Sequence, residues 1–353
     1  MACGACRKVP YCDMVCLESH YIEHMEECFK VIAARVLAGD VHKDDSSGEY
    51  VLKDYVGQCT AKYGALDEET QTGKLIYGEF LRLLGRLDEA KAQLLAALKY
   101  FRATPLGLKH PHTLVSIDRL ATLLQAQGKL GEAKSLFVEK LEASRAALGP
   151  KHPDTLISMN NLAGLLQAQG KLDEAKPLFV EVLEAQRATL APKHRDTLSS
   201  MNNLATLLHT QGKLDEAEPL LVEVLKAKRA TLGPKHPSTL SSTNNLAQLL
   251  QDRGKLDEAK TLMLEVLEAE RTTLGPMHPH TLSSINNLAQ LLQAQGRLSE
   301  AEALAREAFS GKRSTLGAAH FETLHAYLFL VDLLVRQGKR REARELEAAF
   351  KSK

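Results

Sequence analysis

The chain lacks an excess of charge of either sign, with 45 basic residues against 44 acidic ones. A general nucleic-acid binder usually shows a basic excess or stripe, so the balance argues against that class of protein. No apolar run approaches the roughly 18 residues of a membrane-spanning helix, and the N-terminus lacks the apolar core of a signal peptide. We therefore expect a soluble intracellular protein in the cytoplasm, with the nucleus as the alternative.

Motifs for catalysis are also missing. We find no glycine-rich phosphate loop, no nucleophile motif and no carboxylate pair placed for a cleft. The recurrent Asp-Glu of the phrase GKLDEA is explained by the favourable position of negative charge near a helix N-terminus. The sequence thus predicts that the protein is not an enzyme, and an enzyme is kept as the competing hypothesis.

What fills most of the chain instead is a phrase that returns every 42 residues. The motif NNLA begins at Asn160 and returns at this step, and so does the histidine of the phrase LGPKHPxTL. We predict that these histidines are structural loop residues. A period in this range indicates a stacked array, which offers long surfaces rather than enclosed pockets and favours binding over catalysis. The six histidines are His110, His152, His194, His236, His278 and His320.

Each unit of the array predicts a helical hairpin. In the unit over 149–190, Asp154 and Thr155 can cap or charge the first turn of a first helix, and Gly170 ends that helix. Residues 172–190 form a second amphipathic helix. One hairpin cannot bury its apolar stripes alone, but stacked neighbours can, so we predict an all-α fold, an α-solenoid.

Small residues recur where the two helices of a hairpin would cross closely. A larger side chain at these places would hold the helix axes apart, and alanine allows them to approach. The first helix carries the series Ala121, Ala163, Ala205, Ala247 and Ala289, and the second helix carries Ala133, Ala175, Ala217, Ala259 and Ala301.

This pattern of small and large residues resembles the tetratricopeptide repeat (TPR). The version with LGPxHPxTL, NNLA and GKLDEA is similar to the repeats of kinesin light chains. The resemblance covers residues 66–353, as about six or seven hairpins with five full units over 107–316. It implies a non-enzymatic scaffold or adaptor that binds an extended peptide or protein partner in a concave groove; a kinesin light chain-like cargo adaptor is the alternative.

The same resemblance places a set of amides on the inner, groove-lining side of the first helices. An amide offers donors and an acceptor, which suits the backbone of an extended peptide. These asparagines could instead tie helix to helix, and the second asparagine of each NNLA could bond between adjacent units. The candidate groove residues are Asn160, Asn202, Asn244 and Asn286, with Gln167, His209, Gln251 and Gln293.

Five of the six cysteines lie within the first 28 residues. In a reducing compartment, clustered cysteines of regular spacing indicate metal before disulfide. The spacing Cys3-x2-Cys6-x5-Cys12-x3-Cys16, followed by a closing His-x3-Cys, supplies the thiolates and imidazole that zinc prefers. It resembles the MYND zinc finger from the third ligand of that family onward, without the first Cys-x2-Cys pair.

Carried over residue by residue, the MYND pattern implies one complete zinc site from Cys3, Cys6, His24 and Cys28. The other two thiolates, Cys12 and Cys16, make half of a second site. His20 is an alternative ligand. The finger over 1–30 implies a second protein-interaction module.

The spacer over 31–65 is predicted to be helix and loop, with a loop at 44–48 and a helix at 49–62 that caps the array. Some MYND proteins carry a SET methyltransferase domain. A remnant of such an enzyme is a further alternative, but this spacer is far too short to hold that domain.

The assigned ligands predict about one tightly held zinc ion per chain, because only one tetrahedral set is complete. Native mass spectrometry of the whole chain measures this number directly. Finding no zinc, or two zinc ions, would contradict the assigned ligand set.

Overall fold

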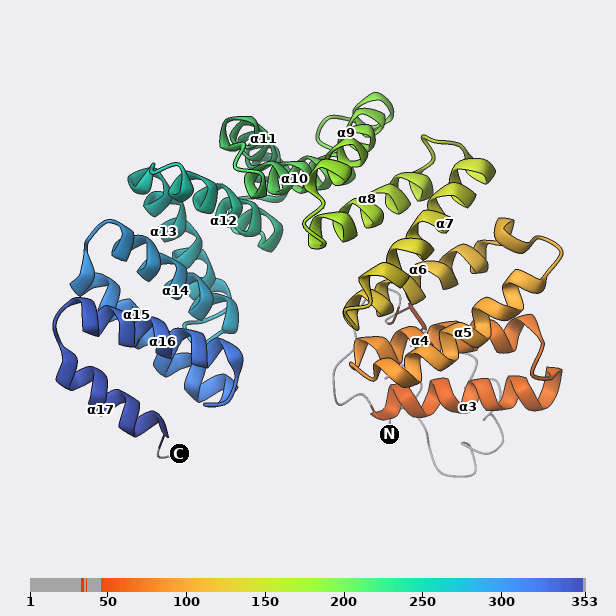
Figure 1. The fold of residues 1–353 in the computed structure, drawn as a ribbon, viewed down its shortest axis with the longest axis horizontal. Coiled ribbons are helices and arrows are strands. Elements are labelled where there is room, and N and C mark those ends of the chain that lie inside the picture. Colours follow the sequence, from red (N-terminus) through yellow and green to blue (C-terminus); the bar gives the residue numbers. More distant parts are fainter. Residues whose placement is uncertain (1–32, 35, 37–45, 352–353) are drawn as a thin grey trace. The chain divides into compact units, whose positions relative to one another are not determined.

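The computed structural model describes residues 33–34, 36 and 46–351 (Figure 1). Over these residues the chain forms fifteen α-helices, one short 3-10 helix and no strands. The prediction of an all-α repeat array is confirmed for this part of the chain. The assigned metal ligands lie outside it.

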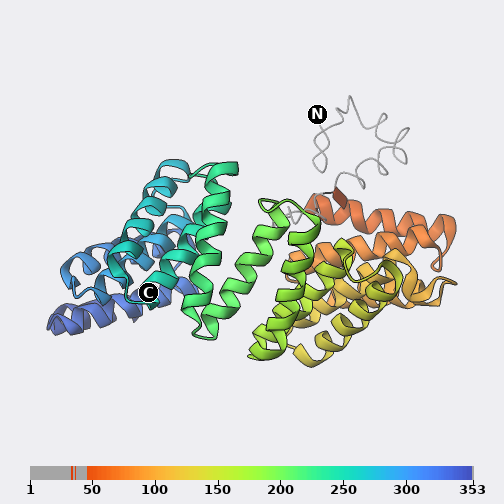
Figure 2. The same ribbon diagram turned by 90° about the horizontal axis from the view of Figure 1, so that it is seen from above.

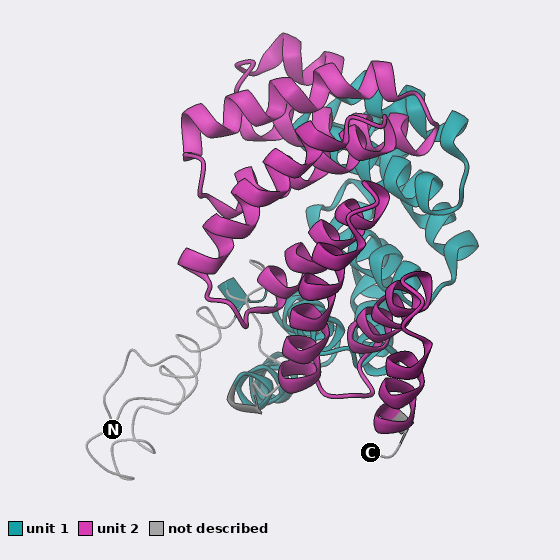
Figure 3. Cartoon of the chain, turned by 90° about the vertical axis from the view of Figure 1, so that its left-hand side faces the viewer, with its two compact units in different colours: residues 1–182 teal, residues 183–353 magenta. Residues whose placement is uncertain are grey.

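The chain divides into two compact units, 1–182 and 183–353, which are described separately (Figure 3). In the first unit the helices are α3 (Ser46–Tyr63), α4 (Glu68–Leu83), α5 (Leu87–Ala103), α6 (Pro111–Ala126), α7 (Leu130–Leu148) and α8 (Pro153–Ala168), with the 3-10 helix η1 (Gly107–Lys109) before α6. Helix α9 (Leu172–Thr189) contains the boundary. In the second unit they are α10 (Arg195–Thr210), α11 (Leu214–Leu232), α12 (Pro237–Asp252), α13 (Leu256–Thr273), α14 (Pro279–Ala294), α15 (Leu298–Leu316), α16 (Phe321–Arg336) and α17 (Arg340–Lys351).

Contacts within each unit follow the order of the chain. Successive helices contact each other along the series α3 to α8, and again along the series α10 to α17. In addition, α4 contacts α6 and α10 contacts α12, so first helices also meet first helices. The succession of antiparallel helices can be followed by colour in Figure 2. This is the stacking that the 42-residue period predicts.

The repeated histidine precedes the first helix of six successive repeats, α6, α8, α10, α12, α14 and α16. In α8, the Nδ1 atom of His152 accepts a hydrogen bond of 3.2 Å from the backbone N–H of Asp154, and Pro153 follows at the first helical position. The other five histidines accept the equivalent bond. Their predicted structural role is confirmed, and the N-cap is this imidazole rather than Asp154 or Thr155. Thr155 instead donates to the carbonyl of Gly149 at 2.8 Å.

Glycine closes the first helix where the sequence predicts. Gly170 adopts a positive φ of 74°, and its N–H donates to the carbonyl of Gln167 at 2.9 Å. The N–H of Lys171 then reaches back to Leu166 at 2.9 Å. A side chain with a Cβ rarely adopts this backbone conformation, so glycine is required at the turn between the two helices.

The alanines that were predicted to sit at helix crossings are all completely buried. Both series, five residues in the first helices and five in the second, have an exposed fraction of 0%. Larger side chains such as Met159, Leu165 and Phe179 fill the space around them and are also buried. The predicted packing of small against large residues is therefore present in both units.

Arginine–glutamate pairs join successive second helices. Arg229 of α11 pairs with Glu265 of α13 at 2.6 Å, and Arg271 of α13 pairs with Glu307 of α15 at the same distance. Two further members of this series are Arg145–Glu181 and Arg187–Glu223. These side chains are about 40% exposed, so each pair contributes no more than about 1 kcal/mol and mainly fixes register.

The helix predicted at 49–62 is present as α3, but it begins at Ser46. The expectation of a loop across 46–48 was therefore wrong. Glu49 explains the extension, because this residue in the first turn of α3 accepts hydrogen bonds from Arg86 at 2.6 Å and Tyr77 at 3.3 Å. Contacts from α4 and its following turn thus hold a segment whose own composition favours a loop.

Among the helices of the described residues, none combines the length and the apolar content that crossing a lipid bilayer requires.

The buried alanines make a substitution test of the packing. In α14, Ala289→Leu is expected to destabilise the fold by about 1–3 kcal/mol, because the added side chain overfills a closed crossing. Ala294→Leu, at an exposed position of the same helix, is the matched control and should change stability by less than about 0.5 kcal/mol. Urea unfolding followed by circular dichroism measures both. Equal midpoints for the two variants would contradict the predicted crossing.

Candidate peptide-binding surface

The predicted groove amides lie on the first helices α8, α10, α12 and α14. Asn160, Asn202 and Asn244 are half-buried, whereas Asn286 is only 4% exposed. The second set, one residue per first helix, is half-buried throughout: Gln167, His209, Gln251 and Gln293. Three asparagines and the second set thus keep some surface for a ligand, and Asn286 is the least accessible member.

Hydrogen bonds between adjacent repeats connect the asparagines of the NNLA phrase. Asn245 of α12 donates its side-chain amide to the Oδ1 atom of Asn202 in α10, at 2.9 Å. In the first unit, Asn161 of α8 donates in the same way to Asp118 of α6, also at 2.9 Å. In these two repeats the second asparagine of the phrase binds the first residue of the same phrase in the preceding repeat. A bond between adjacent repeats was one of the roles that the sequence analysis considered for the second asparagine.

Two members of the second set already contact carboxylates of the following repeat. The Nε2 atom of His209 lies 2.6 Å from Asp252 Oδ2, and Gln293 donates to Asp332 Oδ2 at 2.9 Å. Asp332 also accepts from Arg336 at 2.7 Å. The corresponding Gln251 has no such carboxylate bond within the described chain. The surface around α12 therefore differs from its neighbours in the amide groups it leaves for a ligand.

A pocket opens beside these amides in the second unit. Its volume is about 420 Å³, and its lining includes Ser241, Asn244 and Asn245 of α12. Glu270 and Thr273 come from the last turn of α13, while Lys235 and His280 come from the segments that begin α12 and α14. The arrangement combines amide, hydroxyl and carboxylate groups and can bind a polar or charged side chain.

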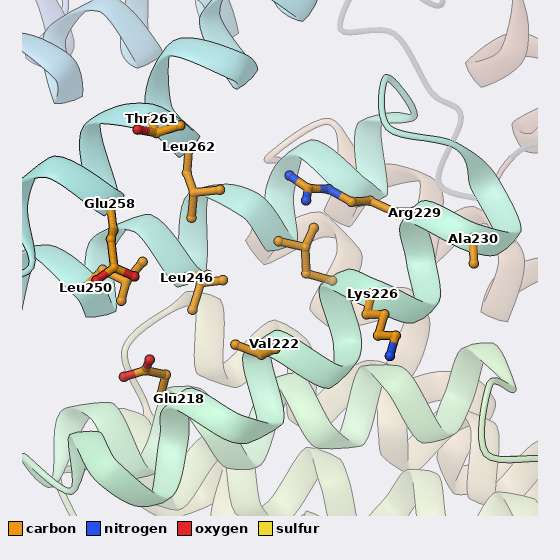
Figure 4. Close-up of a pocket in the computed structure, with 11 residues that line it drawn as sticks. Glu218, Val222, Lys226, Arg229, Ala230, Leu246, Leu250, Glu258, Thr261 and Leu262 are labelled. Atoms are coloured by element: carbon orange, nitrogen blue, oxygen red, sulfur yellow. The ribbon is translucent and has the colours of Figure 1, made fainter.

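A larger cavity, which the sequence reasoning missed, lies among α11, α12 and α13 (Figure 4). It measures about 740 Å³, and Leu246 and Leu250 of α12 line it together with Val222 of α11 and Leu262 of α13. Val222 is 46% exposed although it is apolar. Apolar residues outside the core stripe of the second helices were the available signal for this cavity.

Charge gathers at one wall of this cavity. Glu218 accepts from Lys255 at 2.9 Å and also binds Arg253. These two cations hold the pKa of the Glu218 carboxyl below its usual value, because they favour its charged form. Glu218 is thus already paired within the fold and is not placed to act as a proton acceptor.

All six predicted zinc ligands lie outside the described residues, so the zinc site stays a prediction. Within 33–34, 36 and 46–351, no group of three or more histidine, cysteine, aspartate or glutamate side chains is arranged to hold a metal ion.

A comparison with known protein families identifies the same stacked hairpins as a known repeat. The model of the tetratricopeptide repeat matches in six overlapping segments, 72–139, 113–188, 154–230, 196–272, 238–314 and 281–348. The chain belongs to the tetratricopeptide repeat family. This TPR protein has no match among the curated proteins.

Solved structures give the same fold. A Podosopora anserina protein with nearly identical TPR-like repeats, described as a candidate kinesin light chain, is 33% identical; the match covers 59% of this chain and 98% of that one, with a TM-score of 0.54. BtubC from P. vanneervenii is 23% identical over 65% of this chain and 92% of its own, with a TM-score of 0.56. NprR in complex with its cognate peptide NprX is 17% identical, over 92% and 89%, with a TM-score of 0.54.

The bond between Asn245 and Asn202 predicts a cost when its donor is lost. Asn245→Ala should lower the free energy of unfolding by about 0.5–1.5 kcal/mol, because a half-buried oxygen loses its partner. Asn287→Ala removes the same residue of the next repeat, where the side chain is exposed, and should cost less than about 0.5 kcal/mol. Urea unfolding midpoints compare the two, and an equal loss in both would rule out a stabilising role for the bond.

Proposed function

We propose that this TPR protein is a non-enzymatic scaffold that binds an extended peptide segment of a partner protein along its first helices. The observation that carries the proposal is the recurrence of half-buried amides on first helices that repeat at a fixed step. They are Asn202, Asn244, Gln251 and Gln293 in the second unit, with Asn160 and Gln167 at the equivalent positions of the first unit. An extended peptide presents alternating N–H and C=O groups, and an amide side chain can bind either of them. The pocket of about 420 Å³ beside Asn244 adds room for a side chain of that peptide.

The neighbouring structures support the same class of function. NprR is a protein of the same fold whose structure contains a peptide. At 17% identity this likeness concerns the fold alone, so the proposal for this chain depends on its own amides. The predicted zinc-binding finger over 1–30 would add a second protein-binding module, and its test is the metal count.

The second candidate is a kinesin light chain-like cargo adaptor. It is favoured by the 33% identity to the repeats of the Podosopora anserina protein. Co-purification of the full chain with a kinesin heavy chain distinguishes it from the general scaffold. A heavy chain that remains bound after washing would favour the adaptor, and its absence would leave the scaffold as the better explanation.

The scaffold proposal predicts that α12 amides contribute to peptide affinity. Peptides selected on the full chain from a displayed library should bind the double variant Asn244→Ala, Gln251→Ala about tenfold more weakly, because two hydrogen-bonding side chains are lost. Neither residue has a side-chain bond to a neighbouring repeat within the described chain, so helicity should be kept. Fluorescence polarisation gives the affinities, and circular dichroism gives the helicity.

The matched control is the double variant Lys260→Ala, Glu268→Ala on α13, which removes two polar side chains from a second helix and leaves the net charge unchanged. It should bind the selected peptides as the natural chain does. Undiminished binding by the α12 variant, or a library that yields no binding peptide, would sink the proposal.

A further inference from the structure

One position near the end of the second helices is polar in five successive repeats but differs in charge. The five residues follow one another at the 42-residue step: Ser144, Gln186, Lys228, Glu270 and Lys312. All are buried except Lys228, which is half-buried. Since the flanking sequence changes far less, this position gives individual repeats different chemistry at an equivalent place.

The lysines at this position bind groups of the following repeat. Lys312 donates to Glu322 Oε2 at 2.9 Å, and Lys228 donates to Ser242 Oγ at 2.9 Å and to the Ser238 carbonyl at 3.3 Å. The residues ten places later, Ser238 and Glu322, thus supply the acceptors. In both repeats the buried charge is compensated from within the chain.

Glu270 lacks this compensation. It is 6% exposed, and its Oε2 atom is completely covered and accepts no hydrogen bond from the described residues. The residue ten places later is His280, which is exposed and does not donate to this oxygen. A buried carboxylate oxygen without a donor is costly, so this oxygen favours a donor from outside the chain.

Glu270 lines the pocket of about 420 Å³ together with Asn244 and Asn245, so a donor seated there would lie beside its carboxylate. Asn245 has committed its amide group to Asn202, which leaves its carbonyl oxygen to accept from a ligand. Glu270 and Thr273 lie in the last turn of α13. The C-terminal end of a helix carries partial negative charge and attracts cations.

Two residues with side-chain N–H donors also line this pocket. Lys235 and His280 line it, and both are exposed. Neither donates to the covered oxygen of Glu270. They remain solvated, whereas Glu270 does not, so the buried carboxylate is the group with most to gain from a ligand of positive charge.

From this arrangement we propose that the pocket lined by Glu270, Asn244 and Asn245 takes an arginine side chain of the bound peptide. The planar guanidinium offers five N–H donors and can bind a carboxylate and neighbouring carbonyl oxygens at once. The inference rests on the proposed peptide-binding function and assigns one residue of the ligand. It adds a preference for basic segments at α12 that the uncharged amide rows alone do not provide.

The test uses the full chain and three pools of fluorescein-labelled octapeptides, mixed in sequence except for a fixed central residue. That residue is arginine, its uncharged analogue citrulline, or glutamate. The natural chain should bind the arginine pool about tenfold more tightly than the citrulline pool, the effect of one charge-assisted contact, and the glutamate pool more weakly still.

Two substitutions locate this preference. E270Q places in this repeat the side chain that Gln186 supplies in another, and should bring the affinities for the arginine and citrulline pools to within about twofold of each other. N244D adds a carboxylate at a half-buried position of the same pocket and should increase the preference for arginine. This second variant keeps the test decisive if E270Q does not fold.

Equal binding of the arginine and citrulline pools to the natural chain would overturn the inference while leaving peptide binding intact. So would a preference that survives in E270Q or does not rise in N244D. If no pool binds at all, the proposed function fails together with it.

Discussion

The structure depends on one constraint: a helical hairpin has two apolar faces and can cover only one of them by itself. The completely buried alanines allow the two helices of a hairpin to close, and the next repeat covers the face that remains. Polar bonds then fix the register of this stacking, from Arg229 to Glu265 on the second helices and from Asn245 to Asn202 on the first. Packing supplies the stability, and the polar contacts select one alignment.

The separation of apolar packing from polar contacts explains why the first helices can carry the candidate binding surface. The apolar stripe of each first helix is occupied by packing, so the remaining positions are free of that requirement and can hold amides. Asn202 bonds to the next repeat, whereas Asn244 and Gln251 have no side-chain bond to a neighbouring repeat within the described residues. The bonds between repeats and the proposed recognition surface therefore use neighbouring positions of the same phrase of sequence.

The sequence was sufficient for the hairpins, since their period, glycine turns and alanine crossings are all local patterns. It was not sufficient for the caps: Asp154 and Thr155 are ordinary capping residues, and only the geometry shows that His152 accepts the bond. The start of α3 was missed because contacts from Arg86 and Tyr77 hold it. The surroundings of Glu270 could not be predicted either, because the missing hydrogen-bond donor depends on how the next repeat packs against it.

The bonds between repeats share one more property. The arginine–glutamate pairs of the second helices join residues 36 apart, and the asparagine bonds of the first helices join residues 43 apart. Both kinds of bond therefore connect only adjacent copies of the repeat. Removing or duplicating one complete copy would bring equivalent donors and acceptors face to face at the new junction. The number of copies is therefore a variable that gene duplication can change without first solving a new packing problem. A substitution confined to one copy, such as the glutamate at position 270, can then change the chemistry of one repeat while the other repeats stay alike.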